Sequence, residues 1–385
     1  MSEKFPQFSK PEKSPLSTDA ARKLNELANE KWQEHLLLFS RVKNNVSFVN
    51  PEVLAPLKLK EGESSPLGLF IETAFQEKPG TITKGKQVME TWSQHTRSGI
   101  LGRMFFTDKD GTIYRDVDLK GVGYFGSPDD KKASVIELGK KRWTAAGYVL
   151  PSESFTGILD EDFAFFDYQM SEAFIKKGIR TTRTIAIIKL EELISNGKKI
   201  TLKEARNQGF LGKDMTPVIE VRAFATKLRV ADLPGQWMET KELIIEDAKK
   251  IVSRELGLKE TMPDKEYTEW FAETLGRNVA LIHKNGWFHD YLTPHNITLD
   301  CRIPDLDGVS KLTDGDDRIK DVRNALDAID ELYKSLPISA VHRSSLNYYQ
   351  KIFDMGYTAV FPPEKREKYF EKIQKKLTKK SKENT

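Results

Sequence analysis

The sequence is poor in cysteine, in long apolar runs and in excess charge, and each shortage excludes a class of protein. Its 385 residues include one cysteine, Cys301, so an intramolecular disulfide and a multi-cysteine zinc site are both excluded. No run of about 18 apolar residues occurs, and the first residues hold no apolar stretch of signal-peptide length. We therefore expect a cytoplasmic protein with no membrane partner.

The charge balance does not point to a partner either. Lys and Arg number 61 against 57 Asp and Glu, which gives a net charge of +4. This balance is too even over such a length to favour nucleic-acid binding. A hydrophobic content of 38% is ordinary for a globular chain, and 385 residues are enough for two domains.

Hydrophobic periodicity divides the chain into a strand-rich first part and a helix-rich second part. Apolar positions at helical spacing from Ser17 to about Ser40 predict an amphipathic helix. We predict a flexible lead-in (1–16), an N-terminal helical extension (17–97), a sheet-and-helix lobe (98–235), a mainly helical lobe (236–375) and a basic tail (376–385). The predicted fold class is α+β, with two lobes.

Local patterns place the main elements of both predicted lobes. Residues 98–125 alternate apolar and polar around a DKDG turn, which predicts a hairpin. A helical segment follows and ends at Gly178, and TIAIIKL and PVIEVRAFATKLRV predict two further strands. From about residue 240 onward, long amphipathic patterns predict helices.

The stretch HDYLTPHNITL (289–299), followed by DLDG (305–308), carries the strongest chemical signal. Kinase-type sites hold magnesium with an Asn at the end of a loop and an Asp after the next strand. Asn296 and Asp305 have that arrangement, which predicts Mg²⁺ or Mn²⁺ with ATP as substrate. Asp307 is either a second metal ligand or a turn cap before Gly308.

The general base is harder to assign from the same loop. His289 and Asn296 keep step with the kinase pattern H-R-D-L-x-x-x-N, but Tyr291 takes the place of its Asp. A phenol with a pKa near 10 is a poor base at neutral pH. Asp290 and His295 are both candidate bases, whereas His289 is interpreted as a packing residue.

A nucleotide site of this type also needs a cation on the phosphates, held by an acid on a nearby helix. Lys120, in VDLKGVG, is flanked by apolar residues and followed by Gly121 and Gly123, and we assign all three to nucleotide binding. Glu172 is the expected acidic partner, and Asp167 on the same helix is its rival.

Several segments occur in the order seen in the selenoprotein O family of protein-kinase-like AMP transferases, which the chain resembles as a distant member. The matching segments are DLKGVG (118–123), SEAFIKKGIRTTRTIAII (171–188), VRAFATKLRV (221–230) and HDYLTPHNITL with its later Asp305. They span about residues 98–310, and GIRTTR is the most specific of them. The resemblance implies a protein-kinase-like two-lobed fold.

The resemblance also implies a chemistry. In that family the nucleotide is flipped so that AMP, not phosphate, reaches the acceptor hydroxyl, and paired arginines seven apart help bind the phosphates. Arg222 and Arg229 have that spacing, and the family likewise lacks a loop Asp at the position of Tyr291. The chain departs from the family in having His295 where an acid precedes the metal Asn, Asp-Leu-Asp in place of Asp-Tyr-Gly, and no cysteine near its C-terminus.

Three functions remain open at this point. The first is ATP- and magnesium-dependent transfer of AMP to protein hydroxyls, with ATP and a protein acceptor as partners. The second keeps the fold and moves the γ-phosphate to a protein or small molecule, with Asp290 as base. The third is a non-catalytic, nucleotide-binding pseudokinase, which Tyr291 and His295 favour.

Overall fold

The computed structural model divides the chain into two compact units. Unit 1 comprises Met1–Tyr168 and Arg183–Ala225, and unit 2 comprises Gln169–Thr182 and Thr226–Thr385. The residues described are 35–53, 57–73, 86–91, 98–108, 111–123, 142–143, 149–150, 157–195, 197–209, 211–313, 315–336 and 346–361. The predicted lead-in and basic tail lie outside them. Within these ranges no helix has the length and apolar character needed to cross a membrane.

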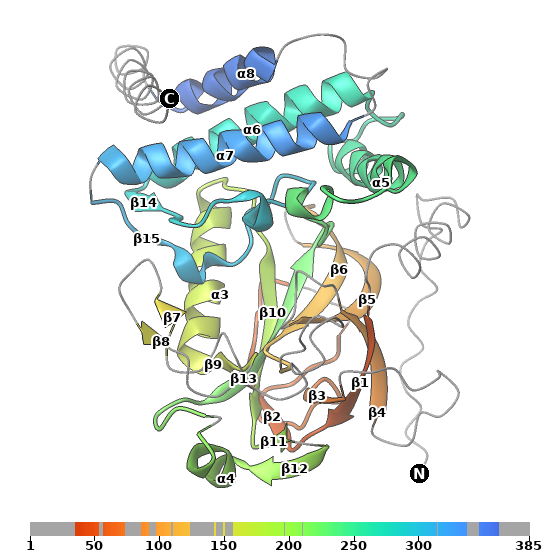
Figure 1. Ribbon diagram of the computed structural model, residues 1–385, viewed down its shortest axis with the longest axis vertical. Helices are drawn as coiled ribbons and strands as arrows, with labels where there is room; N and C mark the ends of the chain where they lie inside the picture. The colour runs from red at the N-terminus through yellow and green to blue at the C-terminus, as the bar shows by residue number, and fades with distance from the viewer. Residues whose placement is uncertain are drawn as a thin grey trace. The chain divides into compact units, whose positions relative to one another are not determined.

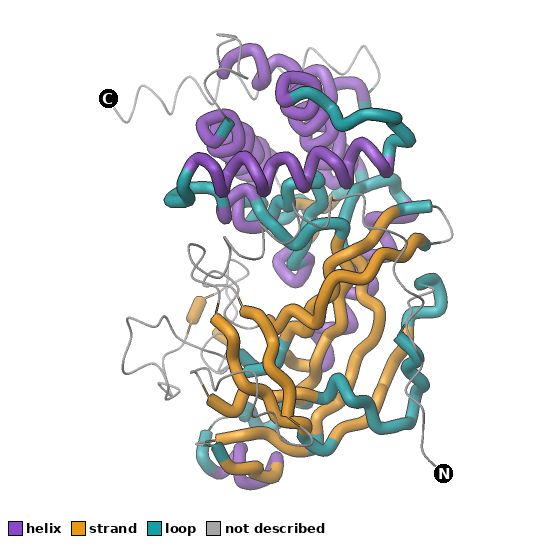
Figure 2. Tube along the Cα trace, turned by 90° about the vertical axis from the view of Figure 1, so that its right-hand side faces the viewer, coloured by secondary structure: helices purple, strands orange, loops and turns teal. Residues whose placement is uncertain are grey.

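Unit 1 is built on a nine-stranded sheet with the order β2-β10-β13-β6-β5-β4-β1-β3, in which β9 joins β13. Figure 2 shows these strands in orange, adjacent and strongly twisted. The strands are β1 (His35–Arg41), β2 (Asn44–Val49), β3 (Leu69–Thr73), β4 (Lys86–Thr91), β5 (Ser98–Thr107), β6 (Ile113–Lys120), β9 (Leu159–Asp160), β10 (Arg183–Leu190) and β13 (Pro217–Phe224). The smaller elements are β7 (Arg142–Trp143) with β8 (Val149–Leu150), β11 (Glu192–Ser195) with β12 (Lys198–Thr201), and α4 (Leu202–Asn207).

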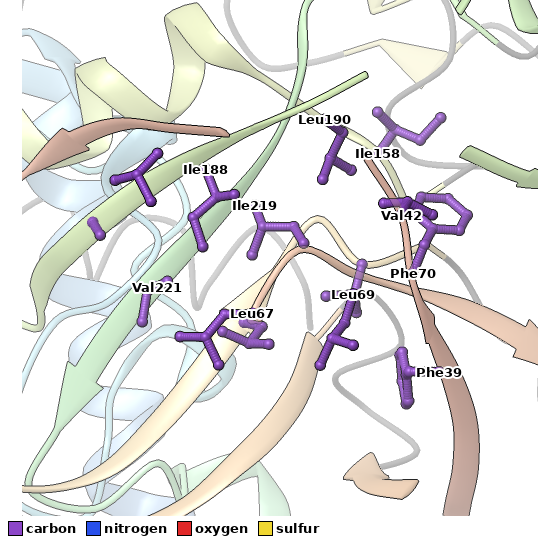
Figure 3. Close-up of a cluster of buried hydrophobic side chains, with 14 of the residues drawn as sticks. Phe39, Val42, Leu67, Leu69, Phe70, Ile158, Ile188, Leu190, Ile219 and Val221 are labelled. Carbon is purple, nitrogen blue, oxygen red and sulfur yellow. The ribbon is translucent and has the colours of Figure 1, made fainter. Parts of the chain in front are cut away.

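Alternate side chains of β13 point into an apolar core on one side of the sheet and onto a charged face on the other. Ile219, Val221 and Ala223 join the main hydrophobic cluster of unit 1, whereas Glu220 and Arg222 between them point to the opposite face because side chains alternate along a strand. The cluster contains residues from seven strands, from α4 and from neighbouring loops (Figure 3), among them Phe39, Val42, Leu67, Leu69, Phe70, Ile158, Ile188, Leu190, Ile219 and Val221.

The prediction of a helical N-terminal extension over 17–97 is wrong for the described residues. Residues 35–91 contribute β1 to β4, and the predicted helix from Ser17 to Ser40 runs into β1; its first part lies outside the described residues. β1 pairs with β3 on one side and β4 on the other. Hydrogen bonding to two neighbouring strands overrides the local helical spacing of leucines.

The hairpin and the helix predicted from local patterns are confirmed. The predicted hairpin is β5 paired antiparallel with β6 across the DKDG turn. The predicted helix is α3 (Glu161–Lys176), and Gly178 follows it with a φ of +73°, a left-handed conformation that suits glycine at a helix end. The described residues form a sheet-rich first part and a mainly helical second part, which confirms the predicted α+β class.

Unit 2 is dominated by four helices, α5 (Met238–Glu255), α6 (Asp264–Lys284), α7 (Gly315–Ser335) and α8 (Leu346–Ala359). α6 packs against both α7 and α8 (Figure 1). The contact between α6 and α8 is unusually close because each helix presents a glycine. A Cβ built on Gly276 would lie 2.1 Å from the carbonyl oxygen of Phe353, and one on Gly356 would lie 2.1 Å from that of Glu273.

We expect Gly276→Ala to destabilise the protein by about 1–3 kcal/mol, because overpacking forces the two helix backbones apart. Urea unfolding followed by tryptophan fluorescence measures the change. Gly212→Ala is the control: its Cβ would meet Met215 at an ordinary 3.5 Å, so we expect an effect within about 0.5 kcal/mol. Equal stabilities of the two variants would contradict the close approach of α6 and α8.

Candidate functional site

The kinase-type loop of unit 2 is closed at its base by a short strand pair. β14 (Trp287–Phe288) pairs antiparallel with β15 (Ser310–Lys311). The intervening residues include two 3₁₀ turns, η3 (Pro294–Asn296) and η4 (Leu306–Gly308). The loop between β14 and β15 contains five candidate residues: Asp290, His295, Asn296, Asp305 and Asp307.

Arg229 is the side chain on which the two predicted metal ligands converge. Its Nη1 donates to Asn296 Oδ1 at 3.3 Å and to the carbonyl oxygen of His295 at 2.5 Å, and its Nη2 donates to Asp305 Oδ2 at 2.8 Å. Arg229 is only 5% exposed. An amide oxygen and a carboxylate oxygen from distant points of the loop therefore face one positive charge.

The backbone of Arg229 is fixed on the loop. Its N–H donates to Asp232 Oδ2 at 2.7 Å, and the N–H of Val230 donates to Ile297 O at 3.0 Å. An antiparallel bridge joins Arg229 to Thr298. The guanidinium can therefore change its place only by rotating the side chain.

The donor set suits a hard cation such as Mg²⁺. Asn296 donates from Nδ2 to the carbonyl oxygen of Tyr291 at 2.9 Å, and this fixes the amide with Oδ1 toward Arg229. Amide and carboxylate oxygens are the protein ligands that Mg²⁺ takes, and it keeps water and phosphate oxygens as the others. Among the described residues no group of three or more His, Cys, Asp or Glu is placed to hold a metal ion. Asp307 is half-buried in η4, and its metal role stays a prediction.

The two candidate bases differ in their surroundings. Asp290 has a left-handed φ of +61° and its carboxylate forms an ion pair with Lys320. His295 is exposed. Its pKa is lowered mainly by partial desolvation of the ring and, to a smaller extent, by the positive charge of Arg229. The Tyr291 side chain is 55% exposed. A neutral imidazole at pH 7 is thus the better proton acceptor of the two.

His289 and the start of the loop are anchored by α7. Asp321 Oδ2 accepts the backbone N–H of His289 at 2.8 Å and lies 3.3 Å from Nε2 of His283. Nδ1 of His283 lies 2.8 Å from the hydroxyl of Tyr357, and burial lowers the pKa of His283. His289 is fully buried, with Nε2 3.3 Å from Pro304 O, so it packs and bonds inside unit 2, as the sequence predicted.

Sequence reasoning missed Asp321, although a signal for it exists. At spacings of four, three and four residues, Asp321, Ala325, Ala328 and Leu332 share one stripe of α7, and all four are fully buried. A carboxylate on the apolar stripe of an amphipathic helix must have a buried partner. That requirement marks Asp321 as a structural or functional residue from the sequence alone.

In unit 1, Lys120 lies at the end of β6 in a buried, charged face. Its Nζ is 3.3 Å from Asp167 Oδ2, and their side chains are 3% and 4% exposed. This contact favours Asp167, the rival acid. Glu172 is buried on the same helix, in the part assigned to unit 2, and its pairing with Lys120 stays a prediction.

Arg222 and the glycines after Lys120 have clear structural roles within unit 1. Arg222 donates from Nε and Nη2 to both oxygens of Asp118, at 3.0 and 2.8 Å, and is 2% exposed. Gly121 and Gly123 have φ of +95° and +100°, and a Cβ on Gly121 would lie 2.5 Å from Val218 O. Phosphate binding by these residues stays a prediction. Arg222 and Arg229 belong to different units.

Glu220 completes the charged face and was not singled out by the sequence. It lies opposite Lys120 in the register of β13 and β6, is 1% exposed, and its Oε1 accepts from Thr184 Oγ1 at 2.6 Å. Burial first, and the negative charge of Asp167 next, raise the pKa of Glu220 well above its ordinary value. On the same face, Lys120 pairs with the carboxylate of Asp167 and Arg222 pairs with that of Asp118.

Comparisons with known proteins give a likeness in structure only. No protein-family model matches the chain, and no curated protein matches it in sequence. A kinase domain of a Toxoplasma gondii specific rhoptry antigen matches at 10% identity over 76% of this chain and 85% of that one, with a TM-score of 0.33. WaaP in complex with acyl carrier protein matches at 13% identity over 67% and 86%, with a TM-score of 0.21. At such scores we draw no activity from either, and the resemblance to selenoprotein O stays a prediction.

We expect the stability of the Glu220→Gln variant, relative to that of the wild type, to increase as pH rises. A carboxyl whose pKa is raised in the folded state keeps a proton that the unfolded chain loses, so the wild type loses stability as pH rises above the ordinary value of 4.5. Glutamine is always neutral and escapes that loss. Urea unfolding of both proteins at about pH 5 and about pH 8 measures the difference. A difference that does not change with pH would contradict a protonated Glu220.

Proposed function

We propose that this chain is an ATP-dependent transferase with a kinase-like catalytic loop, and that it moves AMP from ATP to a hydroxyl group of a protein acceptor, with release of pyrophosphate. The observation that carries the proposal is the convergence of Asn296 Oδ1 and Asp305 Oδ2 on one cation, the guanidinium of Arg229. Phosphoryl and nucleotidyl transfer depend on positioned positive charge more than on covalent chemistry. A loop that gathers an amide and a carboxylate oxygen around a cation supplies such a position.

Asn296 and Asp305 would hold a divalent metal ion in this function. When bound, Mg²⁺ or Mn²⁺ neutralises negative charge on the phosphate oxygens. The backbone carbonyl of Tyr291 orients the Asn296 amide by accepting from Nδ2 at 2.9 Å. Asp321 fixes the start of the loop through the N–H of His289. The two oxygen donors are thus held by separate parts of unit 2.

We propose that Lys120, in unit 1, binds a phosphate group. Asp167, at 3.3 Å, holds its ammonium group. The ammonium is 2% exposed and lies beside carboxylates, so a phosphate would have to compete with them for it. Removing Lys120 would leave those carboxylates buried without their cation, which costs about 3–5 kcal/mol, so the first tests belong in the loop.

We propose His295 as the general base of this transfer. The position that a kinase fills with its catalytic Asp holds Tyr291, and the neighbouring Asp290 is paired with Lys320. His295 is exposed, adjoins Asn296 in sequence and has a lowered pKa, so it is free to accept a proton from an acceptor hydroxyl.

Nucleotide binding without transfer is the second candidate. The specific observation in its favour is that Arg229 already satisfies the two oxygens that a metal ion would need. In this alternative, the guanidinium permanently replaces the metal ion. The alternative predicts ATP binding that divalent ions do not strengthen, and no labelled product.

We expect ATP labelled on the α-phosphate, and not ATP labelled on the γ-phosphate, to label protein acceptors. Asp305→Asn should lower this transfer by about 100-fold or more, because a neutral amide cannot replace the charge of a metal-binding carboxylate. Asp330→Asn, at a half-buried position of α7 paired with Lys334, is the matched control and should keep wild-type activity. Transfer of the γ-label would establish phosphorylation instead. Full activity of Asp305→Asn would place the site elsewhere.

We expect His295→Gln to lower transfer and to remove the acidic limb of its pH profile. A base must be neutral, and the pKa of His295 lies below its ordinary 6.5, so wild-type activity should fall only below that pH. The pH dependence of kcat/KM measures this limb. An unchanged profile in the variant would exclude His295 as the base and return Asp290 to first place.

A further inference from the structure

We propose that Arg229 is a built-in competitor of the metal ion, and that the phosphates of the nucleotide draw it away, so that nucleotide and metal bind cooperatively. The inference rests on the proposed function for the identity of the nucleotide, but its metal-binding part does not. Arg229, Asn296, Asp305 and His295 all lie in unit 2, within the described residues.

The competition follows from shared atoms. Arg229 donates to Asn296 Oδ1 and Asp305 Oδ2, the same two oxygens that would bind Mg²⁺ or Mn²⁺. A metal ion needs these oxygens at about 2.1 Å from itself, which leaves no room for the guanidinium between them. Two positive charges in one buried position would also repel each other strongly.

Protonation cannot relieve this competition. Arginine keeps its charge at every pH at which proteins fold, so the guanidinium has to move. Its backbone is fixed by the Asp232 carboxylate and by the bridge to Thr298, so only the side chain can swing away. The three acceptors that hold it are Asn296 Oδ1, Asp305 Oδ2 and the carbonyl oxygen of His295.

An unsatisfied donor on Arg229 indicates where the side chain would go. Nε of Arg229 is buried and has no hydrogen-bond partner among the described residues, while both Nη atoms are used. A guanidinium binds a phosphate through two parallel N–H donors, one of which is commonly Nε. A phosphate group therefore offers Nε a partner that the present arrangement lacks, and it releases Asp305 and Asn296 to the metal.

Two binding measurements on Arg229→Gln test the proposal, and the expected effects have opposite signs. Without nucleotide, Mn²⁺ binding followed by electron paramagnetic resonance should become at least about tenfold tighter, because the charged competitor is gone. With EDTA present, binding of metal-free ATP should become at least about tenfold weaker, because a phosphate ligand is lost. A purely structural role of Arg229 would weaken both.

Three further variants make the result specific. Asp305→Asn added to Arg229→Gln should abolish the gain in Mn²⁺ affinity, which places the ion at this pair. Arg254→Gln, an exposed arginine of α5 in the same unit, should change neither measurement. Should Arg229→Gln fail to fold, Arg229→Lys provides the test: an ammonium lacks the planar fork of guanidinium donors and holds the three acceptors less well, so Mn²⁺ binding should still tighten, by a smaller factor.

Mn²⁺ binding that is unchanged or weaker in the folded Arg229 variants would overturn the competition. Tighter Mn²⁺ binding with unchanged metal-free ATP binding would overturn the coupling to the nucleotide. These outcomes are independent of transfer. A protein that passes both tests but labels no acceptor would refute the proposed function and leave the inference standing.

Discussion

A guanidinium removed from water keeps its charge, and this constraint organises the loop of unit 2. Arg229 is 5% exposed and cannot be neutralised by losing its proton, so the chain must bring anionic and carbonyl oxygens to it. Asp305 supplies the carboxylate, and it does so from a left-handed φ of +55° that is uncommon for a residue with a side chain. The neutralisation of one buried cation thus shapes the segment in which the candidate chemistry lies.

Unit 1 meets the same constraint with a network instead of one pair. Arg222 binds both oxygens of Asp118, and Lys120 binds Asp167, all with less than 5% exposure. Glu220 lies on the same face, and a third carboxylate would leave the group with excess negative charge in a medium that solvates charge poorly. The raised pKa of Glu220 reduces this imbalance because it favours the neutral form of that carboxyl.

Features that depend on local spacing were predictable, whereas features that depend on distant partners were not. The hairpin of β5 and β6 and the helix α3 follow from turn residues and periodicity. The strand β1 does not, because its hydrogen bonds go to β3 and β4, far along the chain. Asn296 and Asp305 could be paired from motif spacing, but nothing local indicates that Arg229 holds both. For the same reason, sequence spacing alone led to the prediction that Arg222 and Arg229 act as a pair, although the two residues belong to different units.

Backbone groups explain why a tyrosine is tolerated where a kinase has its aspartate. The loop is held by the carbonyl oxygen of Tyr291, which accepts from Asn296, and by the carbonyl oxygen of His295, which accepts from Arg229. Any residue supplies a carbonyl, so the geometry of the cation position is independent of the side chain at 291, which is 55% exposed. A tyrosine in place of the Asp of the kinase pattern therefore leaves the positions of Asn296 and Asp305 unchanged. In the proposed function, proton transfer would fall to His295, which is exposed and has a lowered pKa.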